Sequence, residues 1–125
     1  MTCRIAHSTR SIPHLPFGKM KDDILGGQYE LSLVFVGDAR SRTLNKIYRG
    51  KTYVPNILSF PLEKDCGEIY INPTQARREA KKFNMTPTGF IGFLFIHGLL
   101  HLKGYAHGAT MDKVEIRYIK KFMLS

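Results

Sequence analysis

Alternating and continuous apolar positions predict a succession of strands along the chain. At Tyr29–Val36, polar and apolar residues first alternate and then become continuously apolar. That pattern indicates a strand that passes from an exposed to a buried setting. The same reasoning predicts three further short strands. They are Thr2–His7, Asn56–Phe60, which Pro61 stops, and Glu68–Asn72, which Pro73 ends.

Helix start and stop residues divide the rest of the chain. Thr86 and Pro87 suit the N-cap and first position of a helix, and Gly104 suits its end. They frame the most apolar stretch, Phe90–Leu102, which is shorter than the roughly 20 apolar residues of a membrane span and contains two histidines. We therefore expect a buried core helix. Further helices are predicted at Met20–Leu25, from Asp38 as cap to about Tyr48, from Thr74 as cap, and from Thr110 to about Met123.

The faces of two predicted helices follow from their apolar spacing. In the helix closed by Gly50, Leu44 and either Ile47 or Tyr48 are expected on the inner side. In the last helix the inner stripe consists of Val114, Tyr118 and Phe122. The whole pattern predicts an α+β fold: a single domain over residues 1–125, with a small mixed sheet of about four strands packed against helices.

Charge narrows the choice of partners. The 125 residues include 19 Lys and Arg against 10 Asp and Glu, a net charge of +9 at pH 7. This excess favours an anionic partner such as nucleic acid or a membrane surface. The isolated Cys3 and Cys66 are expected to be reduced thiols, and Met1–Lys21 lacks the continuous apolar segment of a secretory signal. Both observations predict a cytoplasmic protein.

Three histidines supply the candidate chemistry. His97 and His101 are four residues apart, so both side chains project from one helix face. Gly104 allows the chain to turn back and bring His107 to the same point. Three imidazole nitrogens would hold zinc and leave a fourth position for water or substrate, as in catalytic rather than structural zinc sites. The sequence thus predicts a metal site on a helix of the C-terminal half.

The histidine spacing also occurs in a class of zinc peptidases. In metzincins a glutamate follows the first histidine and acts as the general base. Here that position is Gly98. A peptidase therefore stays a minor alternative, and an anionic substrate that matches the positive charge is favoured.

Several motifs occur together in one order. His97–His107 resembles the signature H-G-x-x-H-L-x-G-Y-D-H of the YbeY family. Upstream, Asn45–Lys51 resembles its N-x-x-Y-R-x-K segment, Asn56–Pro61 its N/D-V-L-S-F-P strand, and Gly67–Ile71 its G-D-I-x-I strand. The resemblance runs from about Val34 to His107, which makes it more specific than the histidine pattern alone.

The resemblance to the YbeY family implies a bacterial, zinc-dependent endoribonuclease that acts on single-stranded ribosomal RNA. The implied tasks are 16S rRNA 3′-end maturation on the pre-ribosomal small subunit and ribosome quality control, with no membrane partner. By the same resemblance His97, His101 and His107 hold one zinc ion per chain, and Arg49 and His97 are catalytic. One departure is Ala106, which stands where the family has an aspartate. By motif context Glu68 is either a compensating carboxylate or an ordinary solvated strand residue.

Basic and aromatic residues leave two interpretations open. Arg77, Arg78, Lys81 and Lys82 form a cationic stripe on one predicted helix face, and a similar stripe follows at Lys113, Arg117, Lys120 and Lys121. Each stripe either contacts an RNA backbone or is an ordinary solvated face. The rings of Tyr53, Tyr70 and Tyr105 either stack on unpaired bases or pack in and beside the core. A metal-stabilised RNA-binding assembly factor with little or no hydrolysis is the alternative function.

Overall fold

A four-stranded sheet and five α-helices form the structure, a computed structural model in which residues 3–7 and 13–124 are described. The predicted α+β class is confirmed. In chain order the elements are β1 (Cys3–His7), α1 (Phe17–Leu25), β2 (Glu30–Phe35), α2 (Asp38–Arg49), β3 (Ile57–Glu63), β4 (Cys66–Ile71), α3 (Pro73–Ala80), the 3-10 turn η1 (Lys81–Phe83), α4 (Pro87–Lys103) and α5 (Ala109–Lys121).

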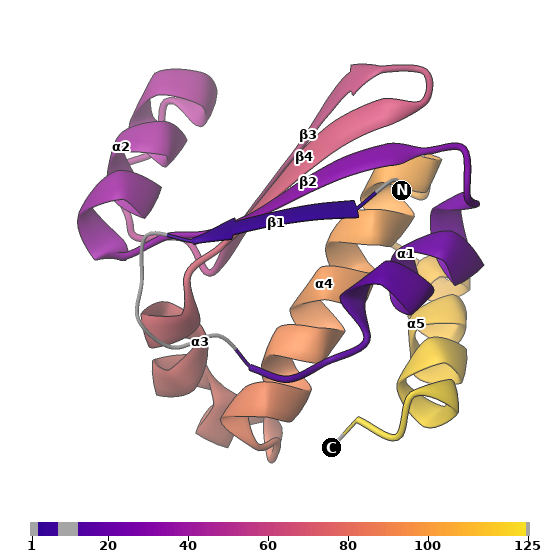
Figure 1. Cartoon of the computed structure of the whole chain (residues 1–125). Helices are drawn as coiled ribbons and strands as arrows, with labels where there is room; N and C mark the ends of the chain where they lie inside the picture. Colours follow the sequence, from indigo (N-terminus) through magenta and orange to yellow (C-terminus); the bar gives the residue numbers. More distant parts are fainter. Residues whose placement is uncertain (1–2, 8–12, 125) are drawn as a thin grey trace.

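The sheet is mixed, as predicted, with strand order β1-β2-β4-β3. The pairs β1·β2 and β2·β4 are parallel, and β3 pairs antiparallel with β4. Strand β3 therefore lies at one edge. Figure 1 shows α1, α4 and α5 together on one side of the sheet, with α2 apart from them at its far end.

Helix α4 forms the centre of the core. Its Phe95 and Leu99 are fully buried, and so are Leu33 on β2 and Ile69 on β4. The predicted buried helix is confirmed. Within the described residues, no single helix has the length and apolarity of a membrane span, although the bent pair Pro73–Phe83 and Pro87–Lys103 meets that criterion jointly across a 102° bend.

The prediction that Pro61 stops a strand is wrong, because β3 continues to Glu63. The carbonyl of Asn56 accepts a hydrogen bond from Asn72 N–H on the β4 side at 3.0 Å. Alternation then directs the backbone groups of Ile57, Ser59 and Pro61 to the open edge of the sheet. Proline lacks an N–H, and at this position no ladder hydrogen bond is lost.

The predicted inner face of α2 is wrong at Ile47 and Tyr48, whereas Leu44 is half-buried. Ser41 and Asn45 are buried, whereas Ile47 and Tyr48 are 66% and 65% exposed. Ser41 and Asn45 face inward because they make hydrogen bonds there. Ser41 Oγ donates to the Pro55 carbonyl at 3.0 Å, and Asn45 Nδ2 donates to the Tyr53 carbonyl at 3.1 Å. The helix thus docks through hydrogen bonds to the loop before β3. It begins at Asp38 itself, with Gly37 in the N-cap position.

Asn72, not Thr74, caps α3. Its side-chain oxygen accepts from the backbone N–H of Thr74 and of Gln75, at 3.1 and 3.2 Å. The helix ends at Ala80, so Lys81 and Lys82 belong to η1 and the predicted cationic stripe is divided between two elements.

Other boundaries shift modestly. Helix α1 starts before the predicted Met20, at Phe17, whose ring is buried. Strand β4 starts at Cys66 rather than Glu68, and α5 spans Ala109–Lys121. Thr2 of the first predicted strand lies outside the described residues. The predicted stripe of α5, Val114, Tyr118 and Phe122, is half-buried against the core.

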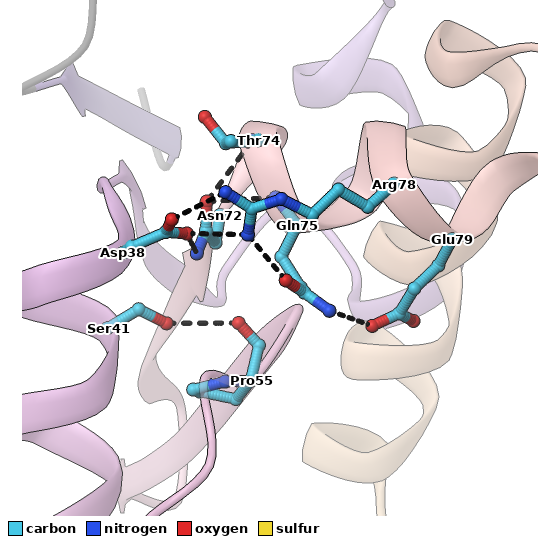
Figure 2. Close-up of polar contacts among 8 residues, drawn as sticks. All are labelled: Asp38, Ser41, Pro55, Asn72, Thr74, Gln75, Arg78 and Glu79. Atoms are coloured by element: carbon cyan, nitrogen blue, oxygen red, sulfur yellow. Dashed lines mark hydrogen bonds and ion pairs between the residues drawn. The ribbon is translucent and has the colours of Figure 1, made fainter.

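A polar network joins α2, β4 and α3 at one end of the sheet (Figure 2). Asp38 accepts from Asn72 Nδ2 at 2.9 Å and from both terminal nitrogens of Arg78, at 3.2 and 2.7 Å. Gln75 continues the network, because it accepts from Arg78 at 2.7 Å and donates to Glu79 at 2.6 Å. These contacts attach the start of α2 to α3 and its N-cap residue.

Candidate metal centre

Helix α4 and the turn after it bring three histidines together. His97 and His101 lie one turn apart on α4, and the helix ends at Gly104, whose φ of +114° is strained for any residue with a side chain. The chain then reverses and returns His107 to the other two. The candidate ligand atoms of the three imidazoles lie within 4.8 Å of one another. The predicted cluster is therefore formed.

Hydrogen bonds fix which ring nitrogen of each α4 histidine faces the cluster. His97 Nδ1 contacts the Glu115 carboxylate, and His101 Nδ1 lies 3.1 Å from the Tyr105 carbonyl. Both partners are acceptors, so each Nδ1 carries the hydrogen. In the neutral imidazoles, which are the forms that bind metals, both Nε2 atoms then carry a lone pair, and they face each other at 3.0 Å. Two lone pairs at this distance repel, and a cation that both can reach at about 2.0–2.1 Å removes the repulsion. The donor set fits a metal ion.

The protonation of His101 is consistent with ligation. Burial, followed by the neighbouring His97, lowers the pKa of His101 from its ordinary value of 6.5. The neutral imidazole, which is the form that binds metals, is thus favoured near pH 7.

Glu115 was not predicted from the sequence. It lies on α5 with its side chain only 8% exposed, and its carboxylate bonds to His97. A carboxylate behind a metal-ligating histidine holds the ring in the ligating tautomer and increases its basicity. The available signal was its position four residues after Met111, which is also buried on α5. A glutamate on a helix face that packs against a histidine-bearing helix is a candidate partner.

The interpretation of Glu68 as the compensating carboxylate is wrong. Along β4 the buried residues Gly67 and Ile69 alternate with half-buried Glu68 and Tyr70. Glu68 therefore points to the sheet face away from α4, where it accepts from the Tyr70 hydroxyl at 3.3 Å. Glu115 is the carboxylate beside the histidines.

Arg49 lies across a pocket from the histidines. The pocket has a volume of about 250 Å³ and is lined by Arg49, Ile57, Leu58, Ser59, His97, Gly98, His101 and His107. The guanidinium donates to Asn45 Oδ1 and to the Tyr53 hydroxyl, both at 3.3 Å. Asn45 is fully buried and also bonds to the Tyr53 carbonyl, so it anchors this arrangement. The structure thus brings together the two parts of the site that the sequence named separately.

The predicted cationic stripe lies elsewhere. None of Arg77, Arg78, Lys81 and Lys82 is among the described residues that line the histidine pocket. Arg78 is engaged with Asp38, and its hydrogen bond lowers the pKa of that carboxyl below 3.8. Arg77, Lys81 and Lys82 are exposed.

Gly98 lets α4 approach the sheet closely. A Cβ atom at this position would lie 2.9 Å from Ile57 Cδ1 and 3.1 Å from Ile69 Cδ1. Position 98 thus faces β3 and β4 rather than open solvent. A glutamate here, as in zinc peptidases, would crowd the half-buried Ile57 and the buried Ile69, which opposes the peptidase alternative.

Comparison with known proteins gives consistent matches. The family described as "Endoribonuclease YbeY" matches residues 14–125. Proteins of that name from Alkaliphilus metalliredigens and Thermodesulfovibrio yellowstonii are 35% and 44% identical over 78% and 76% of this chain, and over 70% and 65% of their own lengths. The Mycoplasma mycoides protein is 37% identical over 67% of this chain, which spans only 58% of that relative. A solution structure of TM1509 from Thermotoga maritima superposes with a TM-score of 0.71 at 25% identity, covering 97% of this chain and 89% of that one.

Proposed function

The chain belongs to the YbeY family of endoribonucleases, and on this premise we propose that it hydrolyses single-stranded RNA at the pocket shared by Arg49 and the three histidines. The observation that carries the proposal is this juxtaposition. A convergent set of imidazole nitrogens and a fixed guanidinium face the same space of about 250 Å³. That combination suits a phosphodiester, whose charge grows in the transition state.

His97, His101 and His107 would hold one zinc ion, since three nitrogen ligands with an open position are typical of catalytic zinc. When bound, the ion supplies Lewis-acid polarisation of a phosphoryl oxygen and activation of water. Glu115 lies behind His97, where its carboxylate accepts a hydrogen bond from Nδ1–H and so keeps Nε2 directed at the cluster.

Arg49 binds the phosphate and stabilises the charge that develops on it. Its planar guanidinium can donate two parallel hydrogen bonds to phosphate oxygens. Asn45 and the Tyr53 hydroxyl restrict its orientation through two of its hydrogen-bond donors. Because the guanidinium is held before substrate arrives, less side-chain entropy is lost on binding.

The RNA and its context follow from the family and from charge. We propose ribosomal RNA as the substrate, at the 16S 3′ end of the pre-ribosomal small subunit and in ribosome quality control, in the cytoplasm. A net charge of +9 supports a polyanionic partner. The exposed Arg77, Lys81 and Lys82 are proposed to contact RNA outside the pocket, whereas Arg78 is committed to Asp38.

Cleavage of a labelled single-stranded fragment from the 3′ region of small-subunit ribosomal RNA tests the proposal. Zinc-loaded protein should cleave it, and both His101→Ala and chelator-treated protein should lose the activity. Metal content is measured on the same samples. Bound zinc with no cleavage above the His101→Ala background would contradict the nuclease. Cleavage of unfolded protein with no effect of RNA would favour the peptidase instead.

One observation favours a second function, an RNA-binding assembly factor with little hydrolysis. The described residues that line the pocket include no carboxylate, and Ala106 is exposed beside His107. Among these residues the pocket thus lacks an evident general base. This function predicts RNA binding that persists in a folded His101→Ala variant. If the nuclease is confirmed, Ala106→Asp measures what an added carboxylate contributes to the rate.

A further inference from the structure

We propose that residues 46–53, the last turn of α2 and the loop after it, bind the unpaired nucleotides that flank the phosphate held by Arg49. In this assignment bases stack on Tyr48 and on Tyr53. The inference rests on the proposed function, because the strand that it places is the RNA substrate of the same pocket. We call residues 46–53 the strand-binding surface.

The strand-binding surface exposes apolar groups that the fold does not use. Ile47, Tyr48 and Tyr53 are 66%, 65% and 53% exposed. Helix α2 buries the polar Ser41 and Asn45 instead, because these bond to the loop carbonyls of Pro55 and Tyr53. Neighbouring exposed aromatic rings mark a binding site more often than scattered apolar residues do.

The charge of the strand-binding surface identifies the class of partner. Lys46, Arg49 and Lys51 alternate with the two tyrosines, and the segment from 46 to 53 contains no acidic residue. All three basic side chains are exposed. Aromatic rings interleaved with cations are the arrangement that binds single-stranded nucleic acid, since bases stack on the rings and phosphates meet the charges. An apolar protein partner would not require this charge.

The strand-binding surface is continuous with the pocket. Arg49 lines the pocket, and the Tyr53 hydroxyl accepts from its guanidinium at 3.3 Å. The Tyr48 ring lies 5.3 Å from the Phe60 ring on β3, and the Phe60 ring lies 5.9 Å from the Tyr70 ring. Tyr48 therefore packs on the sheet face away from α4, beside the edge strand whose Ser59 lines the pocket. Tyr53 is therefore held at Arg49 itself, whereas Tyr48, the residue before Arg49 on α2, is reached by a strand that leaves the pocket over the edge formed by β3.

Stacking on these rings selects unpaired RNA. In an A-form duplex the base faces are covered by their neighbours, and a protein reaches mainly the backbone and the minor groove. A splayed single strand exposes those faces. The strand-binding surface therefore provides a physical reason for single-strand preference that the histidines and Arg49 do not provide.

Fluorescence anisotropy tests the proposal with a labelled, unstructured RNA oligonucleotide and chelator present, so that neither metal nor cleavage is needed. Tyr48→Phe should bind like wild type. Tyr48→Leu, which keeps apolar volume but loses the aromatic face, should raise Kd by about 5- to 150-fold with an unchanged salt dependence. Lys51→Ala should reduce the slope of log affinity against log salt by about 0.7, as expected when one phosphate of a single strand is no longer neutralised.

Matched controls come from the other side of the molecule. Ile116→Ala on α5 removes a similarly exposed apolar group (52%), and Lys19→Ala on α1 removes a similarly exposed charge. Neither should change the Kd or the salt slope as the strand-binding variants do. Circular dichroism confirms that each variant is folded.

The proposal is overturned if folded Tyr48→Leu binds the single strand like wild type, or if it weakens binding to duplex RNA equally. A Tyr48→Leu change that abolishes self-association without affecting RNA would assign the surface to a second copy of the chain and also overturn it. If the protein does not cleave RNA, the binding measurement still tests the strand-binding surface, because that measurement needs neither metal nor cleavage. Conversely, a nuclease whose RNA binding ignores Tyr48 refutes only the strand-binding surface.

Discussion

The hydrogen bonds of the individual ring nitrogens determine which nitrogen of His97 and of His101 faces the cluster. His97 and His101 each have one nitrogen bonded to an acceptor, Glu115 or the Tyr105 carbonyl, and the other nitrogen directed at the cluster. The two Nε2 atoms lie 3.0 Å apart, where one cation can bind both neutral rings. The affinity of the centre therefore depends on residues that never touch the metal.

Glu115→Gln tests this dependence. The amide keeps a similar shape but loses the charge that supports the His97 imidazole, so zinc affinity should fall by about 10- to 100-fold. Competition with a chromophoric chelator measures it. Glu68→Gln is the matched control, because Glu68 bonds to Tyr70 on the other face of the sheet, and it should leave affinity unchanged. Equal affinities for wild type and Glu115→Gln would show that the contact does not support the metal.

The sequence predicts the three metal-ligating histidines, but it does not predict the carboxylate that holds His97 in its ligating orientation. The i, i+4 histidines and the helix-ending Gly104 suffice to place His97, His101 and His107 together. Glu115 carries no motif and reaches His97 from another helix, eighteen residues further along. Its contact depends on how α4 and α5 pack, which local periodicity does not specify.

Among the elements, the close approach of α4 to the sheet shapes the pocket floor. Gly98→Ala places a methyl group 2.9 Å from Ile57 Cδ1 and 3.1 Å from Ile69 Cδ1. Overpacking costs about 1–3 kcal/mol, and the roughly 0.5–1 kcal/mol by which alanine exceeds glycine inside a helix offsets part of it, so the variant should be modestly less stable than wild type. Urea unfolding measures the loss. Adding Ile57→Val should recover part of it in a double-mutant cycle, since that change removes the clashing methyl group. A cycle in which Ile57→Val recovers no stability in the Gly98→Ala background would contradict the close approach.

The attachment of α2 to α3 makes a prediction about acid. Hydrogen bonds from Arg78 and then from Asn72 lower the pKa of Asp38 from 3.8. A carboxyl whose pKa is lower in the folded than in the unfolded state adds stability above the unfolded value and loses it as pH falls through the folded value. Asp38→Asn should therefore cost about 0.2–1 kcal/mol near neutral pH, and the difference from wild type should shrink below about pH 4.

Urea midpoints measured from neutral pH to about pH 3 check this prediction. Arg78→Gln should weaken the same pH dependence, because the guanidinium is the first cause of the shift. A difference between wild type and Asp38→Asn that persists unchanged, or grows, in acid would contradict the assignment.

Helix α2 shows where pattern-based prediction fails among elements. Its apolar positions indicate an inner face with Ile47 or Tyr48, but the structure turns Ser41 and Asn45 inward. Hydrophobic periodicity assumes that burial is driven by apolar area. Here α2 docks against two loop carbonyls, those of Pro55 and Tyr53, which follow Ser41 and Asn45 by 14 and 8 residues. Only side chains that donate hydrogen bonds suit such a surface.

For the whole molecule, the existence of the strands and of the buried helix could be predicted, but their arrangement could not. The order β1-β2-β4-β3 places an antiparallel strand at the edge of otherwise parallel neighbours, and no residue pattern states that order. The edge position in turn explains why Pro61 is tolerated in β3. It also places the open edge of β3 beside the histidines, so that Ile57, Leu58 and Ser59 line the pocket.

The central claim is that a zinc ion held by the histidines and the guanidinium of Arg49 act together on one RNA phosphate. Titration of zinc into metal-free protein, with the initial rate of single-stranded RNA cleavage as the readout, tests it most directly. The rate should rise to a plateau at one zinc per chain. Arg49→Lys, which keeps the charge but loses the paired donors, should lower the plateau about 10-fold or more at the same equivalence point. A rate that is independent of zinc, or an Arg49→Lys protein that cleaves like wild type, would contradict the claim.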